Sequence, residues 1–173
     1  MKILALCGSL RKQSRTLALL QATGALAAAS VDFSIYPALG ELPLFNPDIE
    51  HCAPPSVHSL WHAVSWSDAL IIASPEYAHG VTGTIKNALD WLVGYVPFSG
   101  KPVAVFNPSH RAEHADEALR ETLRTMDARL IPGASLRIPA TGCDLSAQEM
   151  ASSTAFRETI LAALSAIEAF PSS

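Results

Sequence analysis

The sequence predicts an α/β fold built on a doubly wound parallel sheet of five strands, with helices on both faces. Short apolar runs alternate along the chain with longer segments of helix-forming residues. Uninterrupted apolar runs are typical of strands buried on both faces, as in a parallel sheet. The 173 residues are 49% apolar and 16% charged, which favours one globular domain over residues 1–173.

Each expected strand is an apolar run that ends at a polar residue or a glycine. The first run stops at Gly8, and the third and fourth read DALIIAS and KPVAVF. The last run is the shortest and has the weakest pattern. The expected strands cover residues 3–7, 31–36, 68–74, 101–106 and 135–138.

The expected helices lie between these strands and after the last one. The first begins at Ser14, a residue type that favours the N-terminal cap of a helix. Residues 37–55 are broken by several prolines and are not expected to form a helix. The expected helices cover residues 14–29, 56–67, 82–93, 112–128 and 146–170.

Strands that alternate with helices imply right-handed parallel crossovers. Five strands in about 170 residues suit a flavodoxin-like sheet with strand order 2-1-3-4-5. Ligands of such sheets bind outside the carboxyl ends of the strands, at the switch point beside the first strand. The loops after Cys7, Ser74 and Phe106 are therefore expected to converge on one cleft.

Charge, hydropathy and cysteine content exclude several classes of protein. The net charge of −4 argues against a nucleic-acid-binding protein, which would carry a basic face. No apolar run approaches the ~18 residues that a membrane helix needs. The three cysteines, Cys7, Cys52 and Cys143, are few and far apart, so we expect a reducing, cytoplasmic location.

The first loop, GSLRKQSRT, gathers hydrogen-bond donors at the end of a strand. Backbone N–H groups at the start of the following helix bind phosphate readily. Hydroxyl and guanidinium groups would add to them, and the lining expected here is Ser9, Arg11, Ser14, Arg15 and Thr16. An ordinary N-cap with solvated cations explains the stretch equally well. The stretch is neither a Walker A loop nor a dinucleotide-binding G-x-G-x-x-G loop.

A second motif, SPEYAHGVTGTIKNALDW over residues 74–91, follows the third expected strand. Together with GSLRKQSRT it resembles the NADPH-dependent FMN reductase family, which includes quinone, chromate and azo-dye reductases. The resemblance implies that FMN binds with its phosphate in the first loop. It also implies that the second loop lies along the isoalloxazine edge, through Pro75, Glu76, Tyr77, Ala78, His79 and Gly80.

The resemblance implies an NAD(P)H-dependent oxidoreductase that passes electrons through FMN to a quinone, free flavin, metal or azo compound. We assign no side chain as a general acid or base, because the flavin carries the chemistry. The third loop, NPSHRAEH, lacks the glycines usual in the family. We assign Asn107 and Ser109 to the cofactor, and Arg111 with His110 to the nicotinamide donor.

Two other functions remain open at this point. An FMN-carrying electron-transfer protein would bind the same cofactor without oxidising NAD(P)H itself. A zinc hydrolase is a distant alternative, because HRAEH matches the inverted zincin pattern through His110, Glu113 and His114. A metal is not expected, since a match of three fixed positions often arises by chance.

The segment DWLVGYVPFSG, residues 90–100, is unusually apolar for the end of a helix. Its large side chains cannot all face the sheet, and an exposed apolar patch usually marks an interface. The family that the chain resembles forms dimers through this region. We therefore expect a homodimer or a tetramer of such dimers.

Overall fold

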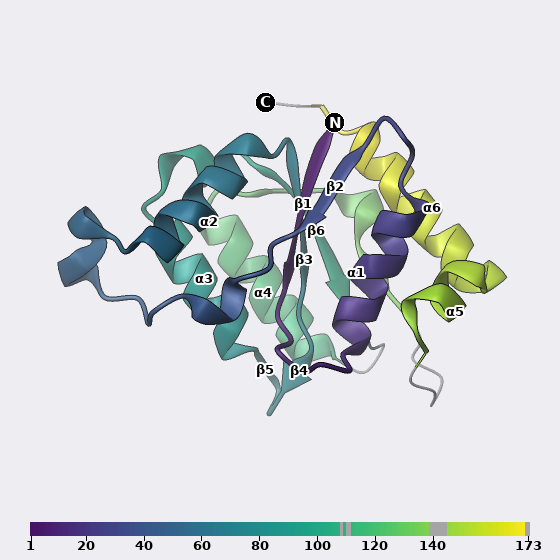
Figure 1. The fold of residues 1–173 in the computed structure, drawn as a ribbon, viewed down its shortest axis with the longest axis horizontal. Coiled ribbons are helices and arrows are strands. Elements are labelled where there is room, and N and C mark those ends of the chain that lie inside the picture. Colours follow the sequence, from purple (N-terminus) through teal and green to yellow (C-terminus); the bar gives the residue numbers. More distant parts are fainter. Residues whose placement is uncertain (108, 110–111, 139–144, 172–173) are drawn as a thin grey trace.

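The computed structural model describes residues 1–107, 109, 112–138 and 145–171, and its centre is a parallel sheet (Figure 1). The sheet runs in the order β2-β1-β3-β6, and two short strands, β7 and β8, both pair with β6. All of these pairings are parallel. The strands are β1 Lys2–Cys7, β2 Asp32–Ile35, β3 Ala69–Ala73, β6 Pro102–Asn107, β7 Arg129–Leu130 and β8 Leu136–Arg137.

The predicted order 2-1-3-4-5 is confirmed, but the fifth position holds two strands where one was expected. The predicted strand at residues 135–138 contains β8, whereas β7 was not expected. The 3-10 turn η4, Pro132–Ala134, separates the two strands. Proline lacks the N–H group that a continuous strand would donate, so the edge strand is interrupted there.

Helices cover both faces of the sheet, as predicted. Figure 1 shows α1, α5 and α6 on one side and α2, α3 and α4 on the other. The predicted last helix is divided in two at Ser153, whose extended backbone ends α5 and precedes α6. The helices are α1 Arg15–Leu26, α2 Pro55–Trp66, α3 Gly83–Leu92, α4 Glu113–Thr125, α5 Ala147–Ser152 and α6 Thr154–Glu168. Across the described residues, no helix is both long and apolar enough to cross a membrane.

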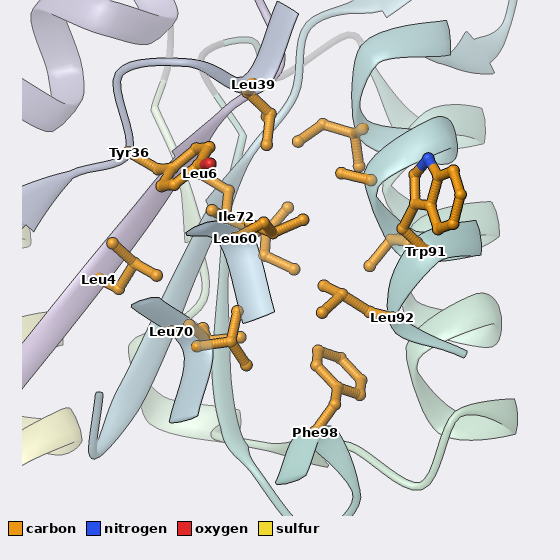
Figure 2. Packing of buried hydrophobic residues seen from close by; sticks show 14 of the residues in the cluster. Leu4, Leu6, Tyr36, Leu39, Leu60, Leu70, Ile72, Trp91, Leu92 and Phe98 are labelled. Atoms are coloured by element: carbon orange, nitrogen blue, oxygen red, sulfur yellow. The ribbon is translucent and has the colours of Figure 1, made fainter. Parts of the chain in front are cut away.

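The two faces of the sheet contribute to two separate hydrophobic clusters, because neighbouring residues of a strand point to opposite faces. In β1, Leu4 and Leu6 pack toward α2, α3 and α4 (Figure 2). Ile3 and Ala5 pack toward α1 and α6. The continuous apolar runs of the sequence therefore reflect burial on both faces.

The proline-broken segment 37–55 forms no α-helix before α2, in line with the prediction, and contains the 3-10 turns η1 Leu39–Glu41 and η2 Pro47–Cys52. Two side chains of α3 hold it. The Asn87 side chain accepts a hydrogen bond from Phe45 N at 2.8 Å and donates one to Pro43 O at 3.0 Å. Trp91 Nε1 donates to the same carbonyl at 2.8 Å. This attachment gives Asn87 and Trp91 of the second motif a structural role.

Candidate functional site

A cavity of about 470 Å³ lies at the carboxyl end of β1 and β3, where the fold predicts ligand binding. Its volume falls within the range of small-molecule sites, roughly 300–1,000 Å³. One side comes from the loop after β1, and the other from the segment after β3 and the start of α4. The lining residues are Ser9, Arg11, Gln13, Ser14, Arg15, Thr16, Pro75, Glu76, Tyr77, Ser109 and Ala112.

The first side of the cavity is the amino end of α1. Ser14 is the N-cap as predicted, with an extended backbone and an Oγ that accepts from Leu17 N at 3.2 Å. Ser14 and Thr16 are buried, whereas Arg11 is exposed. The first turn of α1 carries no acidic residue, so nothing there offsets the positive end of the helix dipole. The chemistry of this donor set suits a phosphate.

Gly8 brings the first loop close to the second. A Cβ atom at Gly8 would lie 2.7 Å from Ile85 Cγ1 and 2.8 Å from Thr82 Oγ1, closer than real contacts allow. A larger residue would therefore push the two loops apart. Thr82 is the N-cap of α3, and its Oγ1 accepts from Ile85 N at 3.4 Å.

The second side of the cavity contains a short hairpin that the sequence did not reveal. Its strands are β4 Glu76–Tyr77 and β5 Gly80–Val81, and they pair antiparallel. Ala78 and His79 form the turn with φ values of 50° and 59°. Two successive positive φ values are the signature of a type I′ turn. Pro75, Glu76 and Tyr77 line the cavity, while Ala78, His79 and Gly80 do not.

Glu76 joins this hairpin to α4. Its Oε2 accepts a hydrogen bond from Ala115 N at 2.8 Å, and its side chain is only 14% exposed. Its Oε1 lies 3.6 Å from His79 Nδ1. The His79 ring in turn packs edge-on against His114 of α4, with ring centroids 4.5 Å apart.

Asn107 supports the third loop through side-chain hydrogen bonds to the loop backbone, and it does not line the cavity. It is buried, its Nδ2 donates to Ala112 O at 2.7 Å, and its Oδ1 accepts from Ser109 N at 3.0 Å. These bonds hold Ser109 and Ala112 at the cavity wall. A direct contact of Asn107 with a cofactor stays a prediction.

Two cavity residues, Gln13 and Ala112, were missed by the sequence reasoning. Gln13 lies directly before the N-cap residue Ser14, and this position is the only feature in the sequence that could have indicated a cavity residue. Ala112 carries no functional group that a motif could identify, and only the approach of α4 brings it to the cavity. The predicted donor residues His110 and Arg111 lie outside the described residues.

The other two residues of the zinc pattern are held by different partners. The Glu113 carboxylate lies 3.7 Å from Arg137 Nη1, and His114 packs against His79. Cys7, at the end of β1, is a buried thiol that donates to Ser9 O at 3.6 Å. Burial raises the pKa of the Cys7 thiol above its ordinary value, so it stays protonated at neutral pH. A buried, protonated thiol of this kind is typical of an unreactive, structural cysteine.

Comparison with known proteins agrees with this geometry. Residues 1–141 match the model of a family described as NADPH-dependent FMN reductase. An NAD(P)H-dependent FMN reductase of Pseudomonas aeruginosa is 31% identical over 173 residues, which cover 96% of this chain and 93% of the relative. A quinone reductase of Pseudomonas putida is 39% identical over 129 residues, which cover 69% of this chain and 68% of the relative.

Solved structures give the same picture. FerB, a flavoenzyme NAD(P)H:(acceptor) oxidoreductase from Paracoccus denitrificans, has a TM-score of 0.78 at 29% identity. The match covers 96% of this chain and 97% of FerB. A flavodoxin from Pseudomonas aeruginosa has a TM-score of 0.60 at 16% identity, covering 94% of this chain and 98% of that chain. The second likeness shows the fold alone, and it confirms the predicted flavodoxin-like architecture.

Proposed function

Because the chain belongs to the NADPH-dependent FMN reductase family, we propose that FMN binds in the cavity beside β1. The chain is an NAD(P)H-dependent oxidoreductase of the FMN/quinone reductase type, and we propose that quinones accept its electrons. The observation that carries the proposal is the concentration of donors at one end of that cavity. Buried hydroxyls, exposed guanidinium groups and the amino end of α1 all face the same space.

The first loop would hold the FMN phosphate. The Thr16 hydroxyl and backbone N–H groups at the start of α1 would donate to it, and Arg11 would add a charge-assisted hydrogen bond. Ser14 already accepts from Leu17 N, and its own hydroxyl hydrogen remains available to donate. The dipole of α1 would further stabilise the negative charge.

The opposite wall would hold the ring end of the cofactor. A ligand whose single phosphate lies in the first loop places its other end against Pro75, Tyr77 and Ala112. These residues would orient the ring and exclude water from one side of it. When bound, FMN supplies the two-electron chemistry that links a reduced nicotinamide to an acceptor. The roles of His110 and Arg111 in donor binding stay a prediction.

The phosphate assignment is tested by Arg11→Ala. Hydrogen bonds to charged groups contribute roughly 1.5–3 kcal/mol, so FMN binding should weaken by roughly 10- to 100-fold. Riboflavin has no phosphate, and its affinity should hardly change. Fluorescence titration with both ligands measures the difference. Lys12→Ala is the matched control, because Lys12 lies in the same loop but does not line this cavity.

The titrations separate the competing explanations. Equal losses for FMN and riboflavin would indicate a general structural defect and contradict the phosphate site. If Arg11→Ala binds both ligands as tightly as the wild type, the first loop would act only as an ordinary helix cap.

Quinones are proposed as acceptors because several relatives are quinone reductases, the one from Pseudomonas putida among them. Steady-state oxidation of NADPH and NADH by the purified protein, with and without a benzoquinone, tests this choice. A protein that binds FMN but oxidises neither nucleotide would instead be an electron carrier. Reduction of ferric or azo compounds in preference to quinones would change the acceptor class and leave the cofactor site in place.

Assembly and location are also proposals. Leu44, Val93 and Val96 are 83%, 62% and 82% exposed. Leu44 lies in the segment held by Asn87 and Trp91, and the two valines follow α3, so these three residues support a homodimer interface at the end of α3. Free thiols at Cys7 and Cys52 support a reducing, cytoplasmic location.

A further inference from the structure

Helix α4 begins beside the cavity without a cap of its own. Its N-cap residue, Ala112, offers no side-chain acceptor. The helices α1, α3 and α5 are capped by their own Ser14, Thr82 and Ser146, whereas α2 and α6, like α4, have no side-chain cap. The first N–H groups of a helix have no partner within the helix and need one from elsewhere. In α4, the Ala115 N–H finds its partner 39 residues upstream, in Glu76.

We infer that Glu76 is a positioning residue, which fastens the hairpin β4–β5 to α4 and so fixes the wall that receives the flavin ring. The inference rests on the proposed function for the identity of the ligand, but the contact that carries it lies wholly within the protein. The acceptor is a carboxylate at the positive end of a helix, which favours a short, strong hydrogen bond. The side chain is largely shielded from water, so solvent does not replace that bond easily.

The same contact determines how Tyr77 faces the cavity. Consecutive residues of a strand point to opposite sides, so anchoring Glu76 on α4 fixes the side to which Tyr77 turns. The hairpin has only two residues in each strand, and a hairpin this short has little stability of its own. Without the hydrogen bond from Ala115 N to Glu76, the hairpin packed against α4 would be only one of several conformations that the hairpin populates. Apparent ligand affinity falls in proportion to the population of the competent arrangement.

The test compares Glu76→Ala with Glu76→Gln. Alanine removes the acceptor, and we expect FMN and riboflavin to bind about tenfold more weakly, by the same factor, because the hairpin belongs to the wall assigned to the ring, which both ligands carry. Glutamine keeps an oxygen that can accept from Ala115 N, and affinities should stay within about twofold of the wild type. Glu121→Ala is the control, since Glu121 is an exposed carboxylate on the same helix.

A second variant separates positioning from simple helix capping. Ala112→Ser supplies α4 with a local cap, and because Ala112 lines the cavity, the affinities of this single variant are the reference for the double variant. In Glu76→Ala/Ala112→Ser, we expect the thermal unfolding midpoint to recover while both affinities remain about tenfold weaker than those of Ala112→Ser. Recovery of the affinities together with the midpoint would overturn the inference, because Glu76 would then act only through the stability of α4. Unchanged affinities in Glu76→Ala would overturn it as well.

Hydrogen exchange of the ligand-free protein tests the anchoring role of Glu76 without any bound cofactor. Exchange at residues 76–81 should be faster in Glu76→Ala and stay faster in the double variant. Wild-type protein that binds no flavin would contradict the proposed function, while faster exchange in that case would still support the anchoring role of Glu76. Unchanged exchange at residues 76–81 would overturn the role, whatever the protein binds.

Discussion

At the scale of single residues, the turn between β4 and β5 places two unsuited side chains in the left-handed region. Ala78 and His79 have φ values of 50° and 59°, where a Cβ atom approaches the following carbonyl oxygen. Glycine and asparagine adopt this conformation more readily. The strained pair lies directly beside the cavity, so the backbone conformation there is maintained by its surroundings, the Glu76 contact among them.

Ala78→Asn should therefore stabilise the protein by about 0.5–1 kcal/mol, because asparagine tolerates the left-handed backbone better than alanine does. Thermal unfolding of the ligand-free protein measures the change. Ala118→Asn is the matched control, since Ala118 is exposed in α4, where asparagine costs about 0.7 kcal/mol relative to alanine. A lower midpoint in both variants would contradict the assigned strain.

At the scale of elements, prediction from sequence succeeded where an apolar pattern extends over several residues. β1, β3 and β6 are such runs, and each is buried along its inner length. The hairpin β4–β5 and strand β7 were missed, because two-residue strands carry no periodicity. The break at Ser153 was missed although Ser152, Ser153 and Thr154 form a run of residues that favour helix caps over helix interiors.

The same limit applies to the cavity. Residues of the first loop were predictable because hydroxyl and guanidinium groups gather within one short stretch. The contact of Glu76 with Ala115 depends on where α4 begins in space, which no local pattern shows. Asn107 likewise bonds to the backbone of Ala112, so its supporting role could not be separated from a cofactor contact in advance.

Asn87 is the element-scale test, because it holds the irregular segment 37–55 to α3. Asn87→Ala removes an acceptor from Phe45 N and a donor to Pro43 O, and should destabilise the protein by about 2–3 kcal/mol. Urea unfolding measures the loss, and limited proteolysis should cut residues 37–52 faster. Asp90→Ala is the control on the same helix, where the exposed pair with Lys86 should contribute less than about 1 kcal/mol. Similar losses in the two variants would contradict the role of Asn87.

At the scale of the whole molecule, the polar cavity and the exposed apolar residues are carried by different parts of the fold. The cavity lies at the carboxyl ends of β1 and β3, whereas Val93 and Val96 follow α3. Within residues 90–100, Trp91, Leu92 and Phe98 are buried, so the expected apolar surface reduces to the two valines. One domain over residues 1–173 stays a prediction.

Val96→Glu tests the proposed interface. A charge at a side chain that is 82% exposed costs little in a monomer, but a dimer would have to bury it. Sedimentation at micromolar concentration should show a dimer for the wild type and a monomer for Val96→Glu. Ala155→Glu, at an exposed position of α6, should leave the dimer intact. A wild type that sediments as a monomer, or a dimer that survives Val96→Glu, would contradict this interface.

The division of the edge strand beside β6 into two short strands also disfavours aggregation by strand addition at this edge. An edge with a long row of free N–H and C=O groups can template the addition of a strand from another chain, which is how sheets propagate into aggregates. Here β7 and β8 each contribute two residues, and Pro132 interrupts the row between them. Within the described residues, a second chain would find no continuous strand at this edge on which to extend the sheet. Newly made copies that meet before folding is complete are therefore less able to join edge to edge on this side.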